Sequence, residues 1–129
     1  MKLVDLTGIA TIDLPIAEFR SHLRLCTGFA DDALQDPILE AALRAAIAAI
    51  EARTGKVLYE RPFRWVVSAW RCPTVQALPV APVTAISSVV TLSRAGDVIA
   101  SSAAEVVLEQ DTHRPMLRAA SSALPMIPM

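Results

Sequence analysis

The stretch DPILEAALRAAIAAIEARTG, residues 36–55, decides how the rest of this sequence can fold. Asp36 is a favourable N-cap, and Pro37 suits the first helical position, where its missing N–H has no intrahelical partner to lose. Gly55 supplies the left-handed residue with which many helices end. The sequence therefore predicts a helix over residues 37–54, roughly 27 Å long at about 1.5 Å per residue.

This predicted helix has two different faces. Four larger apolar residues recur at intervals of four, four and three, which places them on one core-facing stripe: Leu39, Leu43, Ile47 and Ile50. Most other positions are alanine, a strong helix former that leaves a slim helix open to close approach. A helix with so few polar positions is poorly suited to stand alone in water, so we expect another subunit to cover its second face. The candidate subunit-interface residues are Ala41, Ala45, Ala48, Ala49 and Ala52.

Length and composition favour one domain, residues 1–129, with buried interfaces. The sequence has 129 residues, enough for a moderate core without disulfides. Hydrophobic residues make up 53% and mean hydropathy is +0.45, although aromatics are only 5%. No run of 18 apolar residues or signal-peptide pattern occurs, so we expect no membrane association. The two cysteines, Cys26 and Cys72, are then expected to be reduced thiols.

Charge is close to balanced overall but unevenly distributed. The net charge is −1, which gives no overall attraction to nucleic acid. Residues 1–60 carry six Lys/Arg and nine Asp/Glu (net −3), whereas residues 61–129 carry six and four (net +2). This asymmetry suits head-to-tail stacking of subunits.

The order of patterns along the chain predicts an α+β fold. In the helical part, residues 1–56, an extended arm precedes two helices, over about 15–25 and 37–54. In the β part, residues 57–118, apolar and polar residues alternate from 63 to 69, and further strands are expected over 75–78, 84–92, 98–100 and 105–109. The fold class is thus two N-terminal helices followed by a small, mostly antiparallel sheet. The uncharged apolar tail, residues 119–129, is expected to dock on a neighbour or to lead into further sequence.

The sequence predicts no metal site. His22 and Cys26 lie four residues apart on the first helix, but zinc needs three or four ligands, and Cys72 and His113 have no supporting spacing. A separate acidic group consists of Asp31, Asp32 and Asp36. It lacks the spacing of a calcium loop and fits the start of a helix.

The sequence also predicts no catalysis and no cofactor. The serine pairs lack a G-x-S-x-G context, and four glycines form neither a Walker loop nor a dinucleotide fingerprint. We therefore expect that the protein is not an enzyme and has no catalytic or cofactor-binding residues.

Basic and aromatic residues interleave over residues 61–71. They are Arg61, Phe63, Arg64, Trp65, Trp70 and Arg71. One interpretation is a stacking platform for single strands, which would make the chain a small nucleic-acid-binding module. The other is a half-buried strand with its aromatics in the core and its arginines at the surface. The candidate DNA-proximal residues are Arg61, Arg64 and Arg71.

Three motifs in order resemble a known family. A short helix ends in HLRL (22–25), and an alanine-rich helix ends in IEARTGKVL (50–58) directly before an aromatic-rich strand at 63–70. LPVAPVTAISSVVTL (78–92) then steps past two prolines toward a glycine turn. This order, over roughly residues 14–118, resembles the head–tail connector or adaptor proteins of tailed phages and of phage-derived gene transfer agents.

The resemblance implies a virion structural protein made in the bacterial cytoplasm and found in the particle neck. Members form a homo-oligomeric ring, usually taken as dodecameric, beneath the capsid portal protein. The ring joins the portal to the tail or stopper protein and surrounds the channel through which double-stranded DNA leaves. The family implies no catalytic residues and no cofactor. Its chains are usually longer, with further β structure and a C-terminal helical region.

Overall fold

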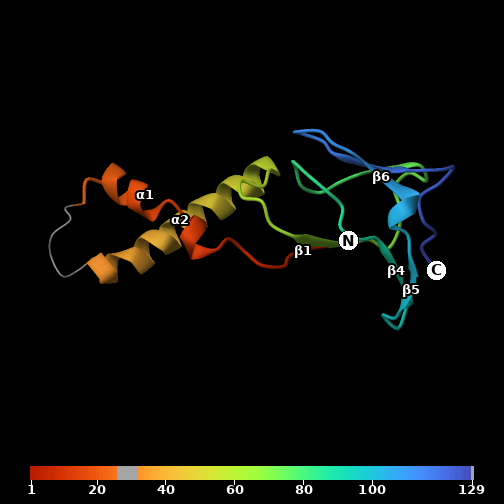
Figure 1. The fold of residues 1–129 in the computed structure, drawn as a ribbon, viewed down its shortest axis with the longest axis horizontal. Coiled ribbons are helices and arrows are strands. Elements are labelled where there is room, and N and C mark those ends of the chain that lie inside the picture. The colour runs from red at the N-terminus through yellow and green to blue at the C-terminus, as the bar shows by residue number, and fades with distance from the viewer. Residues whose placement is uncertain (26–31, 129) are drawn as a thin grey trace. The chain divides into compact units, whose positions relative to one another are not determined.

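The computed structural model describes residues 1–25 and 32–128. The chain divides into two compact units. The helical unit comprises Asp5–Thr54 and Leu58–Phe63, and the β unit comprises Met1–Val4, Gly55–Val57 and Arg64–Met129. Figure 1 shows the elements of both units, which together confirm the α+β class.

The helical unit contains a 3-10 turn and two helices. The turn η1 spans Thr11–Asp13, α1 spans Ile16–His22, and α2 spans Asp32–Thr54. Figure 1 shows α1 lying beside α2. Leu14, which precedes α1, is buried together with Leu39 and Ile47 of α2, so these three side chains mark the apolar centre of the unit.

The start of α2 differs from the sequence prediction. The helix includes Asp32, and Pro37 lies inside it instead of at its first position. Asp36 is therefore not the N-cap, and its carboxylate instead pairs with the guanidinium of Arg20 on α1. Pro37 lies in the second turn, where its missing N–H removes one backbone hydrogen bond of the helix. The predicted end is confirmed, because α2 stops at Thr54 and Gly55 has a φ of 67°.

The described residues form three small sheets where the sequence predicted one. β1 (Lys2–Asp5) pairs with β2 (Phe63–Val66), and β4 (Val90–Leu92) forms an antiparallel hairpin with β5 (Val98–Ser101). The third sheet has the order β3-β7-β6.

All neighbours in that three-stranded sheet are antiparallel, with β7 (Met116–Ala119) between β3 (Val75–Ala77) and β6 (Val106–Glu109). The turn η2 (Ala103–Glu105) precedes β6. Leu117, at the middle of the central strand, is 4% exposed, and Ala81, Pro115 and Leu124 are also buried. The core of the β unit therefore lies on β7 and on the loops packed against it.

Two predictions in the β unit need correction. Residues 84–89 are not a strand, and only Val90–Leu92 of the expected segment pairs with another strand. The tail is also partly docked on its own chain. The N–H of Leu124 donates to the carbonyl of Pro73 at 2.7 Å, and the indole N–H of Trp70 donates to the carbonyl of Pro125 at 2.7 Å. Met126, by contrast, is largely exposed.

Candidate assembly surfaces

The alanine face of α2 is a solvent-exposed surface of the helical unit. All five predicted interface residues are exposed: Ala41, Ala45, Ala48, Ala49 and Ala52. At about 100° per residue they span a stripe of roughly 100° on the side of the helix away from Leu39, Leu43 and Ile47. The structure buries Leu39 and Ile47 and half-buries Leu43, as predicted. Ile50 was wrongly assigned to the core, since it is 48% exposed near the end of the helix.

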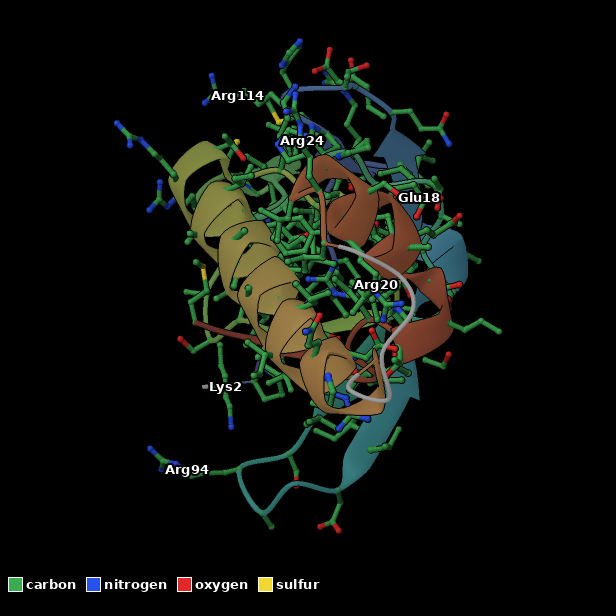
Figure 2. All side chains as sticks on the ribbon, turned by 90° about the vertical axis from the view of Figure 1, so that its left-hand side faces the viewer. Lys2, Glu18, Arg20, Arg24, Arg94 and Arg114 are labelled. Carbon is green, nitrogen blue, oxygen red and sulfur yellow. The ribbon has the colours of Figure 1, made fainter. Side chains whose placement is uncertain are left out.

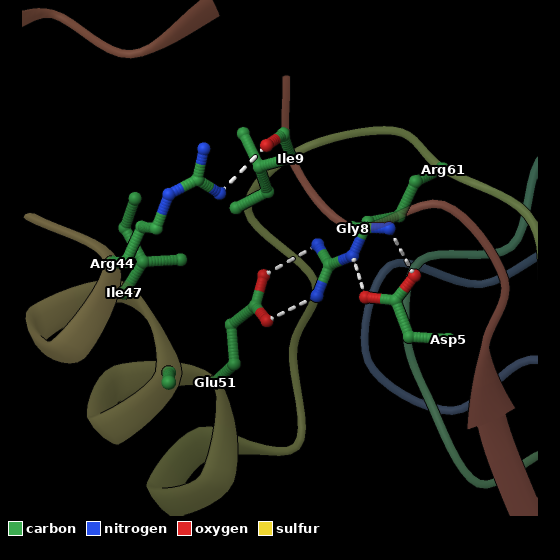
Figure 3. A pocket seen from close by; sticks show the side chains of 8 residues that line it. Asp5, Gly8, Ile9, Arg44, Ile47, Glu51 and Arg61 are labelled. Atoms are coloured by element: carbon green, nitrogen blue, oxygen red, sulfur yellow. Dashed lines mark hydrogen bonds and ion pairs between the residues drawn. The ribbon is translucent and has the colours of Figure 1, made fainter. Parts of the chain in front are cut away.

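A charged cluster, which we call the Arg61 clasp, joins three distant segments of the helical unit: Asp5, Glu51 and Arg61. The Nε of Arg61 donates to Asp5 at 2.6 Å, and its two terminal nitrogens donate to the Glu51 carboxylate at 2.6 and 3.0 Å. Figure 3 shows the guanidinium between the two carboxylates. The Arg61 side chain is 10% exposed and that of Glu51 15% exposed, so the clasp is largely withdrawn from solvent.

Backbone groups complete the clasp and set its electrostatics. The hydrogen bond from Arg61 lowers the pKa of Glu51, and a hydrogen bond from the N–H of Leu58 lowers it further. Burial acts in the opposite direction and raises this pKa, but the net pKa remains lowered. Burial raises the pKa of Asp5, but hydrogen bonds from Arg61 and from the N–H groups of Gly8 and Thr7 outweigh it and leave that pKa lowered. Both carboxylates are therefore ionised near neutral pH and hold the Arg61 cation.

A second arginine fixes the arm that follows β1. Arg44 of α2 donates to the carbonyl of Ile9 at 2.7 Å and to the Glu40 carboxylate at 2.7 and 2.9 Å. Thr11 donates to the same Glu40 carboxylate at 2.9 Å. Between Arg44 and Arg61 lies an open recess of about 190 Å³ whose charged groups are paired with one another (Figure 3). These pairs fasten the arm to α2 and leave no unpaired acid or base lining the recess.

The three predicted DNA-proximal arginines have different surroundings. Arg61 is occupied by the clasp, and its guanidinium carbon lies 4.9 Å above the ring centre of Phe63. Arg64 of β2 and Arg71 are exposed. A sequence-based search could not have detected the clasp, because Arg61 is 10 residues from Glu51 and 56 from Asp5.

The aromatic residues of the 61–71 stretch do not form a common exposed row. Phe63, Trp65 and Trp70 are each partly buried, and Trp70 is tied to Pro125 by its indole N–H. The indole nitrogen of Trp65 is buried without a hydrogen-bond partner among the described residues. The half-buried strand is therefore the better interpretation of this stretch.

Sequence reasoning missed a third surface, the β4–β5 hairpin. Both of its strands expose apolar side chains, namely Val90, Leu92, Val98 and Ile99. The β-branched composition predicted strands here but not their exposure. Exposure depends on what packs against a strand, which the sequence does not state.

The metal and membrane predictions can be compared with the described residues only. Among the side chains that the structure describes, those of residues 1–25 and 35–128, no three from His, Cys, Asp or Glu come together as a metal site. Cys26 and Asp31 lie outside the described residues, and the thiol of Cys72 lies 3.5 Å from the Thr74 hydroxyl. In the same described part of the chain, no helix has the length and apolar character needed to cross a bilayer.

Fold and surfaces together define a small α+β protein with exposed apolar faces on α2 and on the β4–β5 hairpin. Solved structures narrow this class. The chain is 44% identical, with a TM-score of 0.87, to a protein in the neck of an empty gene transfer agent (GTA) particle computed with C6 symmetry. It is 46% identical, with a TM-score of 0.87, to one in the virion of a native GTA particle. It is 41% identical, with a TM-score of 0.80, to one in the neck of a native GTA particle computed with C12 symmetry.

These matches include 99–100% of this chain and 66%, 66% and 63% of the three matched chains, so the chain spans just under two thirds of their length. No protein-family model and no curated protein matches the sequence. With such identity over its whole length, the chain belongs to the head–tail connector family of gene transfer agents. It is a structural protein of the particle neck.

Proposed function

We propose that the chain forms a dodecameric ring that joins the capsid portal protein to the tail or stopper protein and surrounds the DNA exit channel. The main support is the similarity of residues 1–129 to part of the chains in necks computed with C6 and C12 symmetry. A chain placed off such an axis is repeated around it, which is the arrangement a ring requires. In this proposal residues 1–129 act as one connector domain made of the two units.

The alanine face of α2 is proposed as one side of the contact between neighbouring subunits. A closed ring uses heterologous contacts, so each subunit needs two different, complementary surfaces. The five exposed alanines have short side chains, which let another element approach the helix axis closely. An exposed apolar stripe of this kind gains free energy when a neighbour covers it.

In the proposed channel, the residues near the DNA are exposed arginines and not the arginine of the clasp. Arg64 and Arg71 are exposed and can lie near phosphates, whereas the donors of Arg61 are taken up by Glu51 and Asp5. Double-stranded DNA that must slide past the protein is best served by a few sequence-independent phosphate contacts.

The ring function is tested by deleting the gene and imaging the particles. We expect DNA-filled heads without tails, restored to tailed particles by the wild-type gene. Cryo-electron microscopy of the restored particles should show twelve copies around the axis between portal and tail. Tailed particles in the absence of the chain would contradict the proposed function.

The alanine interface is tested with Ala45→Glu, which places a charge at the centre of the stripe. We expect at least about a tenfold loss of tailed particles with an unchanged melting temperature, because a desolvated charge opposes docking but not folding. The matched control is Ala46→Glu, an exposed alanine of the same helix that lies outside the stripe, about 100° around the helix axis from Ala45. Normal assembly of Ala45→Glu particles would remove α2 from the interface.

A further inference from the structure

The β4–β5 hairpin is a well-formed element. Its turn is closed by the N–H of Ser93 donating to the carbonyl of Asp97 at 2.7 Å, and by the N–H groups of Gly96 and Asp97 donating back to Ser93 at 3.0 Å each. Gly96 has a φ of 95°, which only glycine adopts readily. Figure 2 shows Arg94 at the tip, pointing away from the hairpin. The exposed apolar residues therefore lie on an ordered scaffold.

The hairpin exposes more apolar surface than a two-stranded sheet usually shows to water. Val98 is 65% exposed, Ile99 58%, Val90 48% and Leu92 41%. Leu92 pairs with Val98 and Thr91 with Ala100, so Ile99 is the extra residue of a β-bulge. Isolated hairpins are at best marginally stable in water, and exposed apolar strands are sites of association. The hairpin thus has the properties of a docking element.

The distribution of charge between the two units indicates which surface the hairpin docks on. The helical unit has nine Asp/Glu against five Lys/Arg (net −4), whereas the β unit, which carries the hairpin, has four against seven (net +3). The boundary between the compact units therefore separates the charges more sharply than the midpoint of the sequence does. Copies that meet head to tail, with the β unit of one against the helical unit of the next, bring opposite charges together.

We propose that the β4–β5 hairpin docks on the helical unit of the next copy of this chain. This inference rests on the proposed ring and identifies its second contact surface, the counterpart that a heterologous interface requires. The contact joins two copies and does not depend on how the units are arranged within one copy. Val98 and Ile99 supply the apolar centre, and Arg94 lies at a rim that faces an acidic surface.

The surface that the hairpin contacts can be identified by photo-crosslinking in assembled particles. A benzophenone amino acid replaces Ile99 in particles grown with a mixture of isotopically light and heavy copies of the chain. We expect mixed light–heavy crosslinked peptides that join the hairpin to Asp5–Thr54 or Leu58–Phe63 of another copy. A crosslink to a different neck protein, or only crosslinks within one copy, would overturn the proposal.

A paired substitution measures the contribution of the hairpin. Val98→Ser with Ile99→Ser should reduce tailed particles by at least about tenfold while leaving the melting temperature of the purified chain unchanged, because these side chains contact little within their own chain. Val107→Ser is the control, since Val107 lies on β6 and is 53% exposed. Normal assembly of the double variant would overturn the inference but not the ring, which cryo-electron microscopy of wild-type particles tests separately.

Discussion

The helical unit and the β unit are held together by different means. In the helical unit the arm and the 58–63 segment are fastened to α2 largely by charged groups, with Arg61 between Asp5 and Glu51 and Arg44 on the carbonyl of Ile9. In the β unit the central strand β7 buries Leu117, and the tail closes over the core with Leu124. A slim helix with alanine on its outer face can bury little apolar area. The arm and the 58–63 segment are therefore positioned by ion pairs and hydrogen bonds to α2.

The largest expected effect comes from the apolar core of the β unit. Leu117→Ala should destabilise that unit by about 3 kcal/mol, because it removes three buried carbon atoms and leaves a cavity. Urea unfolding followed by tryptophan fluorescence measures it, since both tryptophans, Trp65 and Trp70, belong to the β unit. Val107→Ala on the neighbouring strand, at a site 53% exposed, should change stability by less than about 1 kcal/mol. Equal effects from the two variants would show that the buried centre is not on β7.

The next effect concerns the clasp. Arg61→Met keeps an apolar stem but leaves two partly buried carboxylates unpaired, and should destabilise the helical unit by about 2 kcal/mol. Helical circular dichroism during urea unfolding is the readout, because α1 and α2 both lie in that unit. The matched control is Arg118→Met, which breaks an ion pair with Glu109 in which both side chains are about half exposed. That loss should be much smaller than the loss in Arg61→Met, because solvent screens an exposed ion pair. Indistinguishable variants would mean that the clasp behaves as an ordinary surface pair.

The smallest effect is the acid sensitivity of the clasp. Glu51 and Asp5 have pKa values below their ordinary values of 4.5 and 3.8, so the folded state favours their ionised forms. Their stabilisation is present above the ordinary values and is lost as the pH falls through the lowered ones. The free energy of unfolding should therefore decrease below about pH 4.5, and less steeply in Glu51→Gln than in the wild type. Parallel pH profiles of the two proteins would contradict this assignment.

Local signals predicted much of the fold. Gly55 ended the helix and the 94–97 turn produced a hairpin, because a left-handed residue and a tight turn are encoded within a few positions. The start of α2 was missed because Asp36 has a competing partner, Arg20, 16 residues away. Residues 84–89 carry β-branched side chains but do not pair with another strand, and pairing is not a local property.

The exposure of a surface could be predicted only where its residues recur in the sequence with a regular helical or strand spacing. The alanine stripe follows from the turn of a helix, so its exposure could be expected from the opposite core stripe. The exposed strands of the hairpin carry no such pattern, since Val98 and Ile99 are adjacent residues around a bulge. Arg61 looked like a DNA contact because its two carboxylate partners are remote in sequence, and only the folded chain brings them within hydrogen-bond distance.

The position of the Arg61 clasp in the sequence also affects the order in which the two units can fold during synthesis. Every segment of the helical unit precedes residue 64, so Arg61 is synthesised before residues 64–129 of the β unit. The β unit must wait for β7 and for Leu124, which come close to the end of the 129 residues. The acidic half of each nascent chain can thus reach its complete set of contacts first, while the basic half that bears the hairpin is still being translated.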